Sequence, residues 1–581
     1  MSVLKTFAGA SLAAAVTATS FAGDFKPAQI PSDFSRLVPD GAWAVVYTPS
    51  LNHLVQELMP VARAIDPQAA QALMMAPMMM QMIATTGEAA GGRPAPPAQF
   101  HLDKPMGLAL GPNNPETGEP AFTVIISAKD AGKVRMSNMG SGPSEVVHLP
   151  GTDYVALTNR AFTPGAGPNA LCSGMFAADI AINLDQAAVV KAYGTMIESG
   201  LQMMNMPMPL PAKPTAKDRA DAEAQKRMQE YNLNQIRAFL NGFETWNLGI
   251  DLDATNLDLL AQYTLTPDST IPRAAGSSKQ AMQRLCQHVA ADMPIQFVMN
   301  SASLQAMMDF NAGSEDLYPP ATRAKIAKLM PLIIKSITDI RTGMAGGVAL
   351  GADGMQVMEV MDARDPAAMI SGVRALFELV SNADLGFSAS EFRMVAGDGV
   401  GYKITVDPEQ MMTAFGGASF AGMPGGSANA SAQLKPVFNA LLGGDSIDIR
   451  YVRQRDGDLV GVALGNDMKL VGQLRKLMAK GTKSSPVGEA LEYAWAKPTW
   501  AISMEMRTLL SQGMELVKVM VPPIRVMMPK SFPAGDPIVL DMIGSATETA
   551  DQIRIRTDIQ SWISLIKQFQ TMAAGQARGG A

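Results

Sequence analysis

The repeating plan of this chain is set out in residues 43–59, which read WAVVYTPSLNHLVQELM. The apolar run from Trp43 to Tyr47 predicts a short strand, and Thr48-Pro49-Ser50 forms a polar break after it. Polar side chains at such a break can accept hydrogen bonds from the free N–H groups of a helix start. Beyond it, apolar residues recur at helical spacing, and they are Leu51, Leu54, Val55, Leu58 and Met59. The stretch therefore predicts a strand followed directly by an amphipathic helix.

The same strand–break–helix pattern occurs three more times, with strands that begin near Phe176, Ile295 and Trp500. A hairpin pattern follows each strand–helix pair, within 107–126, 246–266, 347–361 and 538–558. In the third hairpin, Asp353-Gly354 joins two alternating stretches, and both residues tolerate the positive φ of a tight turn. The pattern predicts an α+β fold of tandemly repeated strand–helix–hairpin units, with mixed or antiparallel sheets packed against helices.

Spacing between equivalent residues suggests that the chain is duplicated. Trp43 and Ile295 lie 252 residues apart, and Gly107 and Gly347 lie 240 apart. An offset near this value predicts two tandem halves of two units each, although generic α+β patterns could also agree by chance. The expected divisions are a signal peptide at 1–22, a first half at 23–290, a second half at 291–570 and a disordered tail at 571–581. The pattern leaves open whether the halves are separate domains.

A further helix is expected after the hairpin of each half. Asp130 and Asp365 follow their hairpins at equivalent positions, 235 residues apart, and each is predicted to open a helix.

The N-terminus has the plan of a secretory signal. Lys5 is the only charge before Asp24, Thr6 opens an apolar stretch of small residues, and Ser20-Phe21-Ala22 suits a signal peptidase. Cleavage is expected after Ala22, with Ala18 or a buried N-terminal helix as alternatives. No later segment has about eighteen uninterrupted apolar residues, so no transmembrane anchor is expected. The protein is predicted to be exported, to the periplasm or beyond the cell.

Composition and motifs argue against several functions. The formal net charge of −6 does not suit a nucleic-acid partner, because such proteins gather positive charge. The four histidines are widely separated, and no nucleophile elbow, zinc helix or phosphate loop occurs. The stretch from Asp251 to Asp258 looks like a calcium loop but lacks the required glycine, so it predicts a hairpin turn. We therefore expect no catalytic, cofactor or metal site and no cofactor; an enzyme with a site of scattered residues stays open.

The two cysteines, Cys172 and Cys286, form a candidate disulfide if the chain enters an oxidising compartment. The alternative is a pair of buried free thiols.

Methionine is unusually common, with 43 residues, and two stretches are dense in it. Because its side chain is flexible and polarizable, methionine fills core gaps or lines adaptable apolar surfaces. Clustered thioethers could also hold Cu(I). The candidate apolar binding surface comprises Met74, Met75, Met78, Met79, Met82, Met203, Met204 and Met206.

The stretch Leu37-Val38-Pro39-Asp40, followed by residues 42–47 and Ser50-Leu51, resembles a loose family of exported bacterial proteins of unknown function with duplicated α+β units. The resemblance implies export and repetition, and it transfers no catalytic residue. The predicted function is therefore a non-catalytic envelope or secreted protein that binds a hydrophobic ligand or an envelope protein through an apolar groove. A structural or assembly factor without a small ligand is the alternative.

Overall fold

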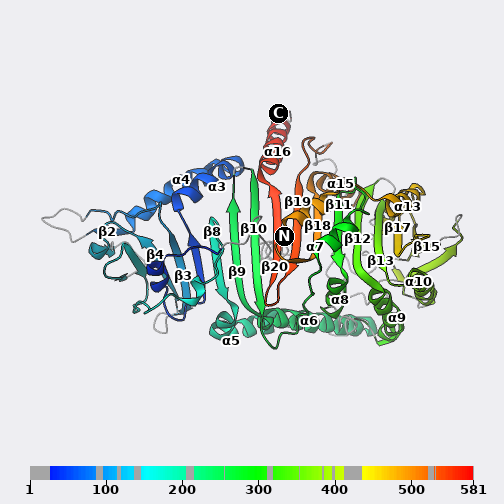
Figure 1. Ribbon diagram of the computed structural model, residues 1–581, viewed down its shortest axis with the longest axis horizontal. Helices are drawn as coiled ribbons and strands as arrows, with labels where there is room; N and C mark the ends of the chain where they lie inside the picture. The colour runs from blue at the N-terminus through cyan, green and yellow to red at the C-terminus, as the bar shows by residue number, and fades with distance from the viewer. Residues whose placement is uncertain are drawn as a thin grey trace. The chain divides into compact units, whose positions relative to one another are not determined.

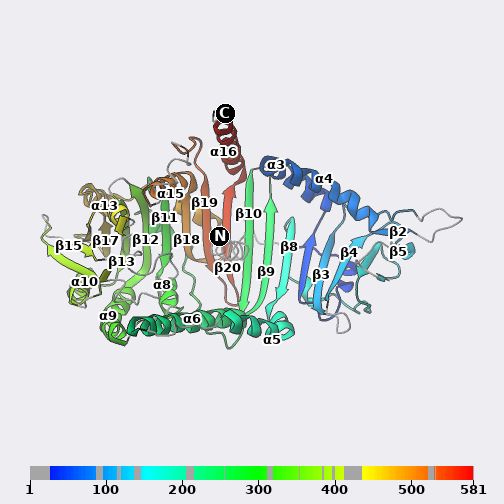
Figure 2. The ribbon, with the colours of Figure 1, turned by 180° about the vertical axis from the view of Figure 1, so that it is seen from behind.

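The computed structural model of the protein is shown in Figures 1 and 2. It describes residues 27–86, 96–113, 119–136, 145–204, 215–253, 255–310, 318, 320–351, 354–382, 385–394, 399–407, 409–410, 435–436, 438–520, 529 and 531–579. The predicted signal peptide, 1–22, lies outside these residues. Two compact units divide the chain. Unit 1 contains the residues up to Ile197, Leu240–Ser269 and Thr549–Ala581, and unit 2 contains Glu198–Phe239 and Thr270–Glu548.

The sheet of unit 1 is antiparallel throughout, in the order β6-β7-β4-β3-β1-β8-β9-β10-β20. The strands are β1 (Ala44–Thr48), β3 (Met106–Asn113), β4 (Pro120–Ser127), β6 (Glu145–His148), β7 (Tyr154–Thr158), β8 (Ile180–Asp185), β9 (Phe243–Leu252), β10 (Asn256–Leu265) and β20 (Asp551–Asp558). Two short strands, β2 (Ala84–Thr86) and β5 (Val134–Met136), pair separately. The first predicted strand and helix are both present, and Ser50 caps the helix through a 3.1 Å hydrogen bond from the His53 N–H.

Helices and short turns pack against both faces of this sheet. They are α2 (Ser32–Arg36), α3 (Leu51–Ile65), α4 (Pro67–Met82), η1 (Ala131–Lys133), η2 (Ala170–Cys172) and α16 (Ile559–Gly579). Two longer helices, α5 (Gln186–Met204) and α6 (Ala216–Gly242), each include a boundary between the units. The predicted tail from residue 571 is helical as far as Gly579, and it contains no proline that would stop the helix.

The sheet of unit 2 is also antiparallel, in the order β14-β15-β16-β17-β13-β12-β11-β18-β19. The strands are β11 (Ile295–Asn300), β12 (Ile340–Gly351), β13 (Gly354–Ala363), β14 (Phe387–Phe392), β15 (Gly399–Val406), β16 (Ser446–Arg453), β17 (Leu459–Leu464), β18 (Lys497–Glu505) and β19 (Val539–Ala546). β13 begins at Gly354 and pairs with β12 as a hairpin, and Gly354 has a positive φ of 90°, which glycine adopts without strain. Asp353 of the predicted turn lies outside the described residues.

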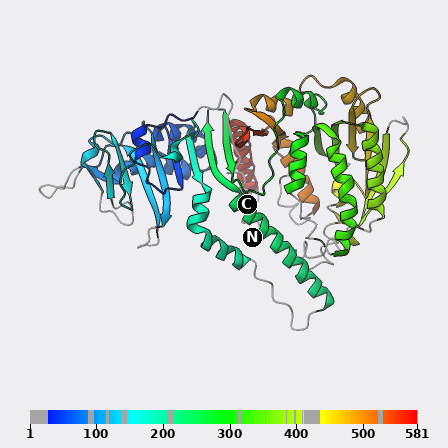
Figure 3. The same cartoon turned by 60° about the horizontal axis from the view of Figure 1, so that its bottom comes forward.

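The two faces of the unit 2 sheet are covered by different helices. On one face lie α7 (Lys279–Cys286), α13 (Lys469–Lys480) and α14 (Pro486–Ala490), whose apolar side chains are fully buried against the strands. On the other face lie α8 (Ser301–Phe310), α9 (Pro320–Thr338) and α10 (Pro366–Ser381), drawn in green in Figure 3. The helix α15 (Met506–Met520) follows β18. The predicted α+β class is confirmed.

Of the two helices predicted to open at Asp130 and Asp365, only the one at Asp365 is present. Asp365 caps α10, because its Oδ1 accepts the N–H groups of Ala367 and Ala368 at 3.0 Å and Pro366 suits the first helical position. Asp130 instead has a left-handed backbone (φ 55°), which does not suit an N-cap, and the chain makes only the turn η1 before β5. Among the described residues, none of the helices is both long and apolar enough to cross a bilayer.

Candidate functional site

The predicted methionine surface falls mainly on α4. This helix contains no charged residue, and five of its methionines are 41–56 % exposed: Met74, Met75, Met78, Met79 and Met82. Met203 is 65 % exposed near the end of α5. The Met204 side chain and all of Met206 lie outside the described residues. The structure therefore places the α4 methionines in one exposed stripe and leaves their binding role a prediction.

The two cysteines are both free and buried, Cys172 in the core of unit 1 and Cys286 in the core of unit 2. Burial raises the pKa of both thiols, that of Cys286 to about 12. Neither thiol is therefore suited to act as a nucleophile at neutral pH, since the thiolate is the reactive form. The predicted disulfide is not formed in this structure and stays a prediction.

The strands at the β8–β20 end of the unit 1 sheet have one face made of aliphatic side chains. Cross-strand register aligns them in rows: Ile180 is opposite Ile250, and Leu259 is opposite both Ile250 and Ile555. Most side chains of this face are half-buried, whereas Ala44, Trp246 and Ala261 are fully buried. We call this the open face of unit 1; it comprises Val46, Ile180, Ile182, Leu184, Leu248, Ile250, Leu257, Leu259, Ile553 and Ile555. The helices α3 and α16 cover only one end of it, where Leu252 is fully buried.

The opposite face of the same strands is polar, and it is the better buried of the two. One row aligns four amides, Asn183, Asn247, Gln262 and Gln552. The neighbouring Arg554 is 1 % exposed and donates to Asp258 Oδ1 at 3.1 and 3.3 Å. The loop around η2 covers part of this face, since the Leu171 carbonyl accepts a 2.9 Å hydrogen bond from Asn183.

The sheet of unit 2 is covered on both faces. The face packed by α7, α13 and α14 is mainly apolar, with Val298, Ala345 and Val360 fully buried, and it also includes the buried Gln296 and Asn300. On the other face, α8 and α10 pack against Met299, Met344 and Met361.

The two faces of unit 1 reverse the usual arrangement of a two-sided sheet, in which the apolar face packs on the core and the polar face meets water. Exposed apolar area costs about 25 cal/mol per Å², and extended apolar patches usually mark sites of binding. The sequence shows the alternation in these strands, because the polar Asp179 and Asn183 point to the face opposite to that of Ile180 and Ile182. Which face would be covered was not visible, because that depends on loops and helices distant in the chain.

An acid cluster at the edge of unit 1 is the main concentration of perturbed titratable groups in this unit. His53 Nε2 lies 3.4 Å from Asp179 Oδ1, and Asp179 Oδ2 accepts the Leu252 N–H at 2.8 Å. Burial, and then the charge of Asp179, raise the pKa of Asp251 to about 6. An acid beside a histidine is a general feature of catalytic sites. None of the three cavities described below includes these residues, so the cluster has no substrate pocket among them.

The stretch that looks like a calcium loop is the β9–β10 turn. Asp253 Oδ1 accepts the N–H groups of Thr255 and Asn256, both at 2.6 Å. Although burial alone would raise it, these donors lower the pKa of Asp253 to about 2. The carboxylate is thus occupied within its own turn.

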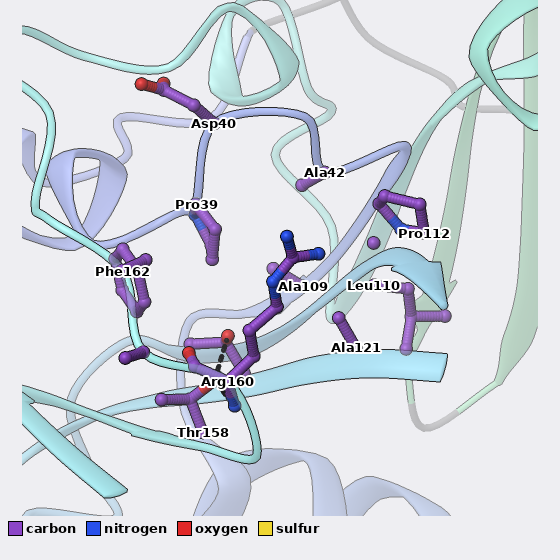
Figure 4. Close-up of a pocket in the computed structure, with 13 residues that line it drawn as sticks. Pro39, Asp40, Ala42, Ala109, Leu110, Pro112, Ala121, Thr158, Arg160 and Phe162 are labelled. Carbon is purple, nitrogen blue, oxygen red and sulfur yellow. Dashed lines mark hydrogen bonds between the residues drawn. The ribbon is translucent and has the colours of Figure 1, made fainter. Parts of the chain in front are cut away.

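The cavity in Figure 4 lies in unit 1 and has a volume of about 220 Å³. Its floor is made of small residues on β3, β4 and β7, among them Ala109, Gly111 and Ala121. Figure 4 shows Phe162 and Asp40 on one side and Pro112 on the other. The Thr123 hydroxyl donates to the Thr158 hydroxyl at 3.0 Å. Asp40 and Arg160 are the charged residues of its lining, which includes no histidine or cysteine.

Two cavities of unit 2 are polar. The first, of about 470 Å³, is lined by Arg341, Asp362, Asp458 and His288 among others. Arg341 donates to Asp362 and Asp458 at 2.6 and 2.8 Å, and these bonds raise its pKa. The guanidinium is therefore already paired with two acids. The second cavity, of about 270 Å³, lies beside Cys286 and Ser485, whose hydroxyl donates to the Cys286 carbonyl. We find no catalytic arrangement in either.

Comparison with known proteins adds little. No family model matches the sequence, and no curated protein matches it. Among solved structures, crystal forms IV, III and I of TP0453 are similar at 9 %, 10 % and 9 % identity, with TM-scores of 0.21, 0.23 and 0.19. They cover 48 %, 49 % and 49 % of this chain and 96 %, 97 % and 96 % of their own. A likeness of this size carries no argument about function.

Proposed function

We propose that this chain is an exported, non-catalytic protein that binds the aliphatic part of a hydrophobic ligand on the open face of unit 1. Its place of action is the periplasm or the cell exterior, as the N-terminal sequence predicts.

The observation that carries the proposal is the inversion of the unit 1 sheet. Its polar side chains are buried under loops and helices, while a largely aliphatic face is left half-buried. Valine, isoleucine and leucine offer dispersion contacts and no hydrogen bonds, so the favoured occupant is a hydrocarbon chain. A peptide would bring backbone N–H and C=O groups onto a surface that cannot satisfy them.

A first test is native mass spectrometry of the full protein purified from an exporting host. We expect a mature mass that lacks residues 1–22, together with bound lipid that leaves on denaturation. A bare mature mass from a protein that also fails to take up apolar dye would contradict ligand binding and favour a structural or assembly role.

A second test measures the affinity for N-phenyl-1-naphthylamine, a neutral apolar dye. Ile182 and Leu248 are cross-strand neighbours on the open face of unit 1, so I182N/L248N places two amides in its centre. Each lost aliphatic contact is worth about 1.5–3 kcal/mol, and every 1.4 kcal/mol is about tenfold in affinity. We expect binding to fall by about tenfold or more if unit 1 holds the dye. M196N, at a 66 % exposed position on α5, is the matched control and should bind as the wild type does.

We propose a second role for the exposed stripe of α4, the docking of an envelope protein. The specific support is that a helix of sixteen residues without charge exposes five methionines. Flexible methionine side chains suit a protein surface of varied shape. A photo-crosslinking residue at position 79 should give one discrete adduct in the exporting cell. The same probe at the exposed Gln56 on α3 should give none, and equal labelling at both positions would contradict the role.

A further inference from the structure

A recess in unit 1 lies above a part of the sheet that has small side chains. Cross-strand register places Ala109, Thr123 and Thr158 in one row across β3, β4 and β7. On the same face, Gly111 is opposite Ala121. Small side chains leave space that larger ones would fill, and the cavity of about 220 Å³ in Figure 4 occupies that space.

This recess is separate from the open face of unit 1. Ala109 pairs with Val45 on β1, whereas the next residue, Val46, belongs to the open face. Successive side chains of a strand point to opposite faces of the sheet. A ligand in the recess therefore leaves the open face free, and a site here goes beyond the proposed function.

The polar groups of the floor already form hydrogen bonds within the protein. The Thr123 hydroxyl donates to the Thr158 hydroxyl at 3.0 Å, and the Thr158 hydroxyl donates to the Phe122 carbonyl, also at 3.0 Å. Both threonines are 2 % exposed or less. The floor therefore offers a ligand apolar contact and few hydrogen bonds.

The cation of the recess is Arg160, which lies exposed on its rim. Figure 4 shows its side chain extending from the end of β7, with the guanidinium between Pro39 and Pro112. Among the described residues, Arg160 forms hydrogen bonds through its backbone alone, with the Thr158 hydroxyl. The Asp40 carboxylate is directed away from the guanidinium in Figure 4. The guanidinium is therefore available to a ligand.

Phe162 provides an aromatic wall. Its ring is half-buried and packs against the core of unit 1, which fixes its position. A flat ring between this wall and the small residues of the floor gains dispersion and aromatic contacts. The recess is smaller than the pockets of about 300–1,000 Å³ that hold drug-sized ligands, so a molecule with a single ring suits it.

We propose that this recess binds a small aromatic monocarboxylate, whose carboxylate pairs with Arg160 while its ring lies between Phe162 and the floor. A guanidinium presents parallel N–H donors that match the two oxygens of a carboxylate. One guanidinium compensates one negative charge, and Asp40 on the rim disfavours a dianion such as phosphate. An aromatic amine would bring a second positive charge beside Arg160.

The test compares benzoate with its neutral isostere benzamide and with the cation benzylamine, by ligand-observed NMR titration of the full mature protein at pH 7. We expect benzoate to bind about tenfold or more tightly than benzamide, as a hydrogen bond between charged groups allows, and benzylamine to bind more weakly than either. Acetate and inorganic phosphate, which lack the ring, should bind more weakly than benzoate. R160Q should reduce benzoate binding to the level of benzamide. R160K should keep part of the preference, because lysine keeps the charge without the planar fork.

A second variant changes the floor and leaves the charge in place. In G111A the added Cβ would lie 3.5 Å from the Ala121 Cβ, an ordinary contact, so the variant should fold and fill part of the recess. We expect it to weaken benzoate and benzamide binding alike. The matched control for charge is R63Q, at an exposed arginine of α3 outside the lining, which should leave both affinities unchanged.

Arg160 is exposed, so R160Q is expected to fold, and a circular dichroism melt checks this. The proposal is wrong if benzoate is not preferred over benzamide, if R160Q keeps the preference, or if phosphate binds as tightly as benzoate. It is also wrong if none of these ligands binds. The dye assay on the open face reads a different surface, so any of these failures leaves the proposed function standing.

Discussion

At the scale of single residues, the pKa of an acid depends on its neighbours in the fold. Asp251 and Asp253 lie two residues apart, yet their pKa values are shifted in opposite directions. Asp251 faces Asp179 and Asp258 in a buried row, whereas Asp253 is held by donors of its own turn. Spacing in the sequence could not separate these two acids, because the difference comes from neighbours on other strands.

The raised pKa of Asp251 makes a stability prediction with a definite sign. Its folded pKa of about 6 exceeds the ordinary value of 3.8. The stability that this shift contributes is therefore fully present below about pH 3.8 and is lost as pH rises through about 6. D251N should therefore raise Tm by a few degrees at pH 7.5 and change it little at pH 4. Calorimetric melts across this range provide the measurement.

Asp253 supplies the control of opposite sign. Its lowered pKa stabilises the fold above 3.8 and loses that effect as pH falls through about 2. D253N should lower Tm slightly at pH 7.5. Equal shifts of the same sign in both variants would contradict the assigned environments.

At the scale of elements, the pairing of β18 with β19 places a tryptophan directly against a glycine. Gly544 on β19 pairs with Trp500 on β18, and a Cβ there would lie 2.2 Å from the indole Nε1. The bulky ring lies over the glycine, and the register of this pair shifts near Pro498 and Trp500.

G544A should therefore destabilise unit 2 by about 1–3 kcal/mol, as overpacking of a core position does. The control is G513A on α15, where nothing lies within 4 Å of the added Cβ and alanine favours the helix by up to about 1 kcal/mol. Urea unfolding of both variants measures the difference. Destabilisation by G513A that matched that of G544A would show that the Trp500 contact is not the cause.

At the scale of the whole molecule, the two units share one order of strands. The first strand of each lies between the following hairpin and a later strand–helix pair: β1 between β3 and β8, and β11 between β12 and β18. We propose that the halves descend from one duplicated segment, as the offset in the sequence predicts. The shared order supports the proposal.

The last strand of the chain completes unit 1. β20 pairs with β10, and the buried Arg554 neutralises Asp258, although burial still raises the pKa of that carboxyl. R554M should destabilise unit 1 by about 2–4 kcal/mol, because it removes the main partner of a buried acid and leaves only Arg556, whose Nη1 lies 4.0 Å from Asp258 Oδ2. Adding D258N should recover a large part of the loss, which a double-mutant cycle in urea measures. Additive losses would contradict the ion pair.

The sequence alone determined the elements of this protein, because strand alternation, helical spacing and turn residues are local properties. It predicted the strand–helix starts near residues 43, 295 and 500, and the hairpin that β12 and β13 form. It could not predict that Asp130 would adopt a left-handed backbone while Asp365 capped a helix. Only the tertiary structure decided which faces of each sheet are covered, since that depends on segments hundreds of residues apart.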